Sequence, residues 1–198
     1  VNIFGNNITL ESTIRNNLTV DEGDAFNELL HKKSLNNLKS LNYFNTVEAD
    51  ILDGSLNGQK IINITVEEKP TGEISAGAGI GTSGGSVMFG VKENNFLGRG
   101  VAFGTNITLD AESLKGVISL NNPNYKGTNR SLNLSAQNVS TDRLTDYGYK
   151  SNKTGITIGS GFELYDDLYL NRGLSVSTEK LDTSSKASAN IKSQEGTY

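Results

Sequence analysis

The chain has 198 residues, contains no cysteine and carries a formal net charge of −4. The absence of cysteine excludes disulfides and thiolate metal sites within the chain, and the negative charge argues against a nucleic-acid partner. No apolar run approaches the roughly 20 residues of a transmembrane helix, which leaves open a membrane β-barrel, because barrel strands give only a weak alternating signal.

The first 69 residues predict a small α/β module in the order strand, helix, helix, strand, strand. Residues 1–4 open it as a short strand. Residues 47–52 and 60–67 predict two further strands, and the turn-forming segment 53–58 between them predicts a hairpin. About 70 residues in this order are enough for one domain with one core.

Two amphipathic helices are expected between the first strand and the hairpin. Thr9 is the candidate N-cap of the first helix and Asp24 that of the second, because their side-chain oxygens accept bonds from free backbone N–H groups. His31, the only histidine, is expected at the surface of the second helix. The expected apolar positions are Leu10, Ile14 and Leu18 in the first helix, and Phe26, Leu29, Leu30, Leu35, Leu38 and Leu41 in the second.

The pattern changes at Pro70. Beyond it, stretches of about ten residues alternate apolar with small or polar side chains, which is the length that a tilted strand needs to cross a bilayer. The polar positions are mostly Gly, Ser, Thr and Asn, and the connections at 140–152 and from 180 onward are long, as in outer-membrane barrels. Seven strands are expected, within residues 73–81, 86–92, 101–109, 114–121, 131–137, 154–164 and 168–178.

One alternative and two details bear on this interpretation. A soluble antiparallel sheet, apolar on one face and wet on the other, is the alternative. Arg172 falls on the apolar positions of the last strand. Either it lies near the periplasmic end, where a long side chain reaches the interface, or a bulge shifts the register. Seven strands cannot close a barrel, since the minimum is about eight, so further strands are expected beyond Tyr198.

Several motifs resemble, in their order and spacing, one family of membrane proteins. Those of the first 69 residues resemble the polypeptide-transport-associated (POTRA) repeat: Phe4-Gly5-Asn6, Ile14-Arg15, Glu22-Gly23-Asp24, Leu38–Leu41, Tyr43–Val47 and Val66–Lys69. Those of the second half resemble the start of the barrel in BamA-type outer-membrane assembly factors: Ile80-Gly81, Asn95–Gly100 and Asn122–Tyr125.

This resemblance implies an α+β POTRA domain at 1–69 in the periplasm and the N-terminal part of an antiparallel outer-membrane β-barrel at 70–198. The implied function is the insertion and folding of β-barrel proteins by strand templating at a lateral gate, without ATP, cofactors or covalent chemistry. An open strand edge leaves N–H and C=O groups unpaired in lipid, and an incoming strand can satisfy them. The implied gate strand comprises Gly72, Glu73, Ile74, Ser75, Ala76, Gly77, Ala78, Gly79, Ile80 and Gly81.

The glycines of this strand have two interpretations. They weaken packing, so that the strand is easily bent or opened, or they fit a tight barrel interior. The segment Gly77–Gly81 is not a phosphate-binding loop, because it lies within a strand and no helix follows. No catalytic or metal-binding constellation is found, and the pairs Glu67-Glu68 and Asp166-Asp167 are expected to be solvated.

The resemblance also implies partners: nascent outer-membrane proteins, a BamD-like lipoprotein with other assembly-complex subunits, and membrane lipid. Arg15 and Glu22 match docking positions for the lipoprotein, whereas a second basic position of that site is Thr19 here. Glu22 also fits a plain turn residue.

Other functions remain open. A two-partner secretion transporter or a translocation-and-assembly transporter shares the same architecture, and a passive outer-membrane channel or a soluble adhesive β-protein belongs to another class. The start at Val1 and the end within a polar stretch indicate a piece of a longer protein, with a signal sequence expected upstream.

Overall fold

The computed structural model describes residues 1–81, 84–165 and 168–198. The expected turn at Thr82–Gly85 falls partly, and the pair Asp166-Asp167 wholly, outside the described residues. The chain forms two compact units. The first comprises Val1–Gly72 together with Asn94–Val101, and the second comprises Glu73–Glu93 together with Ala102–Tyr198.

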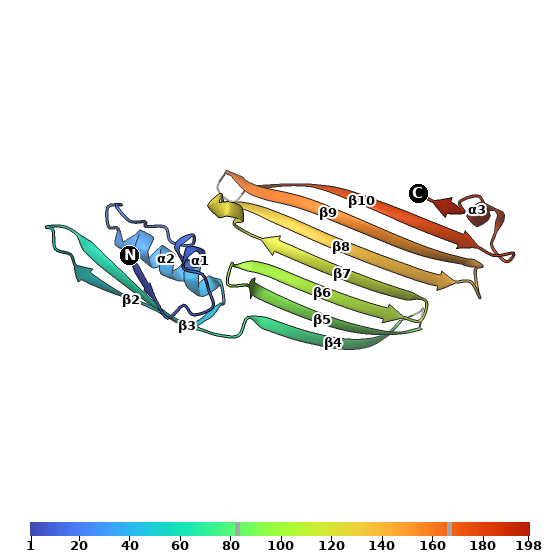
Figure 1. The fold of residues 1–198 in the computed structure, drawn as a ribbon, viewed down its shortest axis with the longest axis horizontal. Helices are drawn as coiled ribbons and strands as arrows, with labels where there is room; N and C mark the ends of the chain where they lie inside the picture. The colour runs from blue at the N-terminus through green and yellow to red at the C-terminus, as the bar shows by residue number, and fades with distance from the viewer. Residues whose placement is uncertain (82–83, 166–167) are drawn as a thin grey trace. The chain divides into compact units, whose positions relative to one another are not determined.

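The first unit is a three-stranded sheet with two helices on one face (Figure 1). Its strands are ordered β1-β3-β2, with β1 parallel and β2 antiparallel to β3. The predicted order of strand, helix, helix, strand, strand is confirmed. The elements are β1 (Asn2–Phe4), α1 (Glu11–Arg15), α2 (Glu28–Ser40), β2 (Phe44–Asp53) and β3 (Lys60–Glu68).

An apolar core lies between this sheet and its helices. Successive side chains of a strand point to opposite faces, so every second residue of β3 from Ile62 to Val66 points inward. Ile14 of α1 and Leu38 of α2 close over them and are fully buried. The core comprises Ile14, Leu38, Tyr43, Phe44, Val47, Ile62, Ile64 and Val66.

Both helices begin later than the sequence predicts. The N-cap of α1 is Leu10 rather than Thr9, and no side chain caps this helix. The N-cap of α2 is Asn27 rather than Asp24, because Asn27 Oδ1 accepts hydrogen bonds from the backbone N–H groups of the first turn. Asp24 instead accepts a bond of 2.9 Å from the Asp21 N–H within the preceding turn.

The buried face of α2 differs from the face that the sequence predicts. His31, Ser34 and Leu38 point into the unit, whereas Leu30 is 40% exposed. The prediction that His31 lies at the surface is therefore wrong: it is 6% exposed and lies beside the ring of Phe26. Burial lowers the pKa of His31 below its ordinary value, and Glu28 only partly opposes this shift.

The second unit is an open sheet of eight strands in which chain neighbours lie side by side from β4 to β11 (Figure 1). The seven long strands are those that the sequence predicts. Within the described residues, no helix is long and apolar enough to span a membrane. The strands are β4 (Gly72–Gly81), β5 (Gly84–Phe96), β6 (Val101–Asp110), β7 (Ser113–Asn122), β8 (Arg130–Arg143), β9 (Tyr149–Tyr165), β10 (Leu168–Thr183) and β11 (Gly196–Thr197).

The last strands extend further than expected at one end of the sheet. β8, β9 and β10 have 14, 17 and 16 residues, so the connection expected at 140–152 shrinks to five residues, Leu144 to Gly148. Beyond β10 the chain forms α3 (Ala189–Lys192) and the short β11, which pairs with Lys180 and Leu181. The extended ends of these strands are polar and are held by backbone pairing. Their sequences therefore lack the apolar alternation that predicts a strand.

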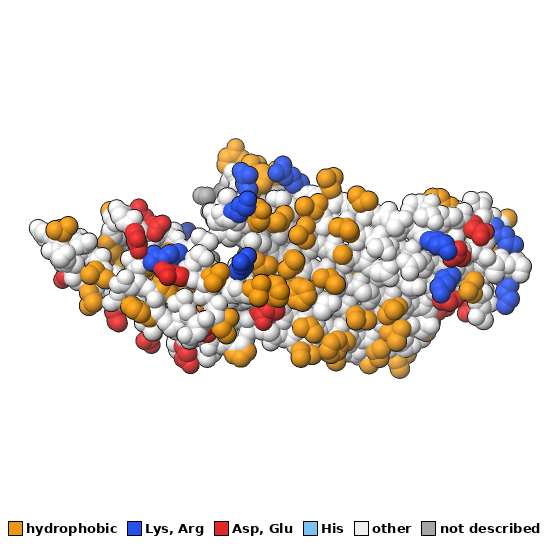
Figure 2. Space-filling model, viewed as in Figure 1, with side chains coloured by type: hydrophobic (Ala, Val, Ile, Leu, Met, Phe, Trp, Pro, Cys, Tyr) orange, Lys and Arg blue, Asp and Glu red, His pale blue; other side chains and the backbone are white. Residues whose placement is uncertain are grey.

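The register of the sheet separates apolar from polar side chains. One row, Phe103, Leu120, Leu134, Ile158 and Leu174, is apolar throughout, and the next row, Gly104, Ser119, Ser135, Thr157 and Ser175, is small or polar. Adjacent rows face opposite sides, so the sheet has one apolar face. Figure 2 shows apolar side chains over the sheet and charged ones gathered at the end that carries α3.

Arg172 follows this register. It pairs with Ser160, and the register shift of the β9–β10 hairpin lies between Leu168 and Tyr169 instead. A bulge at Arg172 is therefore ruled out, and its side chain belongs to the apolar face.

Candidate functional site

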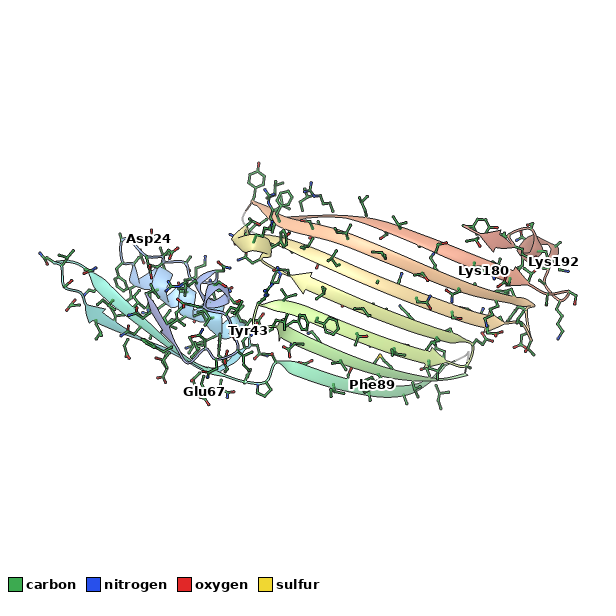
Figure 3. The ribbon with its side chains drawn as sticks, viewed as in Figure 1. Asp24, Tyr43, Glu67, Phe89, Lys180 and Lys192 are labelled. Carbon is green, nitrogen blue, oxygen red and sulfur yellow. The ribbon has the colours of Figure 1, made fainter. Side chains whose placement is uncertain are left out.

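Strand β4 forms one edge of the open sheet, and among the described strands only β5 lies beside it (Figure 1). All ten residues of β4 are exposed, with Ile74 at 76% and Ile80 at 94%. Phe89 of β5, labelled in Figure 3, is also about half exposed. An edge strand presents a row of unpaired N–H and C=O groups, and the residues expected to form the gate strand lie together on this edge of the described sheet.

Three glycines of β4, Gly77, Gly79 and Gly81, are not required by crowding from the described residues. A Cβ atom at Gly77 would lie 3.7 Å from Met88 Cε, and one at Gly79 would lie 3.4 Å from Ser86 Oγ. A Cβ at Gly81 would meet no atom within 4 Å. These are ordinary contacts or open space, so each position has room for a side chain.

Gly90 of β5 provides the contrast. A Cβ at this position would lie 2.7 Å from Ser75 Oγ and 3.2 Å from Asn106 Nδ2, so a side chain here would displace its neighbours. Gly90 lines a hollow of about 410 Å³ on the polar face of β4–β7, together with Glu73 and Lys92. Among the described residues, no group of three His, Asp or Glu side chains could hold a metal ion.

A second candidate site lies on the first unit, where Arg15 and Glu22 meet. Arg15 Nη1 donates to Glu22 Oε1 at 3.0 Å and Arg15 Nε donates to Glu11 Oε1 at 2.7 Å. Hydrogen bonds and charge from the Val1 amino group and then from Arg15 lower the pKa of Glu22. The structure therefore brings the two expected docking residues into one ion pair, and Glu22 remains 60% exposed.

Thr19, which occupies the position of the second basic residue, bonds within the unit instead. Its N–H donates to Ser34 Oγ at 2.8 Å, and its hydroxyl accepts from the same atom at 3.2 Å.

A third cluster, which sequence reasoning missed, involves the segment Asn94–Val101. We call it the 94–101 cluster, and all of it belongs to the first unit. Buried Asn95 donates to Thr9 Oγ1 at 2.9 Å and accepts from the Gly100 N–H at 2.8 Å. The carbonyl of Gly98 accepts from the Leu10 N–H at 2.9 Å. It also accepts from the buried Thr13 hydroxyl at 2.9 Å. These bonds hold the segment against the start of α1.

Glu68 completes the 94–101 cluster from the end of β3. Its carboxylate accepts from the N–H groups of Asn7 and Ile8 at 2.9 Å and from that of Thr9 at 2.6 Å. Burial favours the protonated form, but the bonds from Thr9, Ile8 and Asn7 together outweigh it and lower the pKa of Glu68. The carboxylate therefore fixes the chain that carries Thr9.

Two glycines fit the segment to its surroundings. Gly98 has φ +70°, and a Cβ there would lie 2.0 Å from the Ile8 carbonyl oxygen. Gly100 has φ +64°, and its Cβ would lie 3.0 Å from Thr13 Cγ2 and 3.7 Å from the hydroxyl of Tyr43, which Figure 3 labels. The motif Asn95–Gly100 contains both glycines and the buried Asn, and this pairing was the signal available in the sequence.

Two family models match the chain. The family model of POTRA, the surface antigen variable number repeat, matches residues 1–69. The Omp85 superfamily domain matches residues 95–198, more than half of the chain.

One curated relative matches along the whole chain. The outer membrane protein assembly factor BamA of Neorickettsia risticii is 27% identical over 214 residues, which cover 100% of this chain and 27% of that protein. The chain thus spans about a quarter of that relative.

Two solved structures share the fold. BamA from Haemophilus ducreyi lacking POTRA domains 1-3 has a TM-score of 0.80 at 26% identity, covering 91% of this chain and 35% of that chain. CdiB from Acinetobacter baumannii has a TM-score of 0.60 at 14% identity, covering 96% and 39%, and this likeness concerns the fold alone.

Proposed function

The chain belongs to the Omp85 superfamily, and from this premise we propose that it assembles outer-membrane β-barrel proteins by templating their strands on β4. The observation that carries the proposal is the place of β4 at the edge of the described sheet, with ten exposed residues and three glycines that have room for side chains. A strand whose edge groups are unpaired in lipid gains several kcal/mol for each group that an incoming strand satisfies.

The templating step is non-covalent. A nascent strand adds to β4 through main-chain hydrogen bonds, as in other cases of β-augmentation. Glycines at alternate positions from Gly77 to Gly81 leave that part of one face of β4 without side chains, so the strand can bend away from a closing partner. The gate residues are Gly72 to Gly81, and their substrates are nascent outer-membrane proteins.

The location follows from the family. We assign residues 1–69 to the periplasm and residues 70–198 to the outer-membrane barrel, with the apolar face of the sheet toward lipid. The row Leu134, Ile158 and Leu174 supports this orientation, because large exposed apolar side chains need an apolar phase. BamA relatives and both family matches point to the same membrane.

We also propose the exposed pair of Arg15 and Glu22 as the docking point for a BamD-like lipoprotein. The pair is supported by its geometry, since an incoming charged group can exchange with either member. Thr19 supplies no second cation, so this docking relies on fewer charges.

A cross-linking experiment in the full-length protein tests the templating proposal. Cysteine is placed at Ala78 on β4 or at Ile118 on β7, and a second cysteine is placed in the terminal strand of a substrate barrel. Ile118 is a matched control because it is exposed on the apolar face but lies in a strand paired on both sides. Adducts are expected at Ala78 during assembly and not at Ile118.

The outcomes separate the candidate functions. Equal adducts at both positions, or none at either, would contradict templating on β4. Adducts of a secreted protein with residues on the polar face of the sheet would favour the two-partner secretion transporter instead, and conductance without adducts would favour a passive channel.

A further inference from the structure

Two arginines lie on the apolar face of the second unit's sheet. Arg130 pairs in register with Phe162, and Arg172 pairs with Ser160. Alternate positions of a strand point to the same side, so both arginines share the face of Ile158 and its apolar row. A charged side chain on a lipid-facing surface is costly near the bilayer centre and is tolerated near the interface, where an anion or water compensates it.

The protein itself provides no counter-charge among the described residues. Arg130 lies over the ring of Phe162, 5.7 Å from its centroid. Neither Arg130 nor Arg172 forms an ion pair with another described residue. Glu163 follows Phe162 in β9 and therefore points to the opposite face. The recorded ion pairs of this unit lie toward the other end of the sheet, where Figure 3 labels Lys180: Arg143–Glu112, Lys150–Asp142, Lys153–Glu179 and Lys180–Asp182.

The two arginines lie near the same end of the sheet. β8 begins at Arg130 and β10 begins at Leu168, and β9 runs antiparallel between them. β4 runs in the same direction as β8 and β10, because the strand direction alternates along the meander. In the orientation proposed above, this end faces the periplasmic leaflet, which is built of glycerophospholipids.

We propose that Arg130 and Arg172 bind the phosphate of an anionic phospholipid headgroup on the outer wall of the barrel. Guanidinium groups donate paired hydrogen bonds to phosphate oxygens. Strand spacing places the two Cα atoms about 12 Å apart across β9, a distance that two long side chains close around one headgroup. Exposed Leu170 and Leu174 provide contacts for the acyl chains.

The site rests on the proposed membrane orientation, but its test is independent of assembly activity. Full-length protein in detergent is titrated with phosphatidylglycerol, and binding is measured by native mass spectrometry. The variant Arg130→Gln/Arg172→Gln is expected to bind about thirtyfold more weakly, since each cation contributes about fivefold at an anionic surface. Each single variant is expected to lose about fivefold, which keeps the test valid if the double variant does not fold.

The control is Lys115→Gln/Lys153→Gln, which removes the same charge from the polar face of the same sheet. It should leave the affinity within about twofold, because those cations do not face lipid. Equal losses in both double variants, or unchanged affinity in the arginine variants, would overturn the site. Displacement of the lipid by equimolar inorganic phosphate would overturn its assignment to a lipid. A failure of strand templating would leave these results unchanged.

Discussion

The two units differ in whether their apolar side chains are buried or exposed. Of the ten buried apolar side chains in the described residues, nine lie in the first unit, and Ala187 alone lies in the second. The second unit instead exposes large apolar groups, including Leu174 at 75% and Val176 at 76%. A sheet of this kind has no core of its own and depends on an apolar phase outside it. The first unit is stabilised by its own buried core, whereas the second is stabilised by the apolar phase around it.

The largest effect on stability is expected from a substitution in the core of the first unit. Leu38→Ala removes a fully buried side chain and should lower the free energy of unfolding by about 4 kcal/mol. Leu174→Ala, on the exposed face, should cost less than about 1 kcal/mol in the membrane. Pulse proteolysis of the full-length protein in urea compares the two, and equal losses would contradict the contrast between the units.

Gly98→Ala tests the backbone requirement of the 94–101 cluster. The positive φ and the approach to the Ile8 carbonyl oxygen should together cost about 3 kcal/mol. Gly81→Ala is the matched change in the second unit, where the added methyl group meets no atom within 4 Å; it should cost less than about 0.5 kcal/mol. Thermal unfolding of the full-length protein measures both variants, and a neutral Gly98→Ala would show that the segment does not pack as described.

Asn95→Ala tests the polar bonds of the same cluster. It removes the bond to Thr9 Oγ1 and the side-chain acceptor of the buried Gly100 N–H, which should cost about 2 kcal/mol. Asn138→Ala removes bonds from an exposed amide and should change stability by less than about 0.5 kcal/mol. Hydrogen exchange at the Gly100 amide should accelerate only in the first variant; unchanged protection there would refute the role of Asn95.

The smallest expected effect is a pH dependence of the first unit. Because the pKa of Glu68 is lowered from its ordinary 4.5, its contribution is complete above that value and is lost as the pH falls through the lowered pKa. Glu68→Gln should cost about 1 kcal/mol at neutral pH and reduce the loss of stability below pH 4.5. Unfolding midpoints between pH 3 and 7 measure this, and parallel curves for both proteins would argue against the prediction.

Much of the architecture was predictable from the sequence. The alternation in β3 and in the seven long strands has a period that only strands produce, and the motifs resembling POTRA and BamA-type barrels are confirmed by the family matches. Helix starts were less predictable, because Asp24 and Asn27 are both good capping residues and only tertiary packing selects Asn27. The polar ends of β8–β10 gave no apolar signal.

The 94–101 cluster could not be predicted because its partners lie far apart in the chain. Thr9 fits an N-cap by local rules, yet its hydroxyl bonds to Asn95, 86 residues away. His31 illustrates the same limit: a Lys-rich sequence suggested solvent, whereas His31 lies on the face of α2 that packs into the first unit. Local sequence indicates which contacts a residue can form. Packing between distant segments determines which of those contacts are present in the fold.

The membership of Asn94–Val101 in the first unit has a consequence in time. When the chain has been synthesised only as far as residue 72, the Leu10 N–H and the Thr13 hydroxyl have no Gly98 carbonyl to bind. The first unit is therefore completed only after β4 and most of β5 have been made, because its last segment begins within β5 and ends at Val101. A fragment that stops at residue 69 therefore lacks part of the first unit. The β4–β5 hairpin is synthesised before the first unit has all of its hydrogen-bond partners.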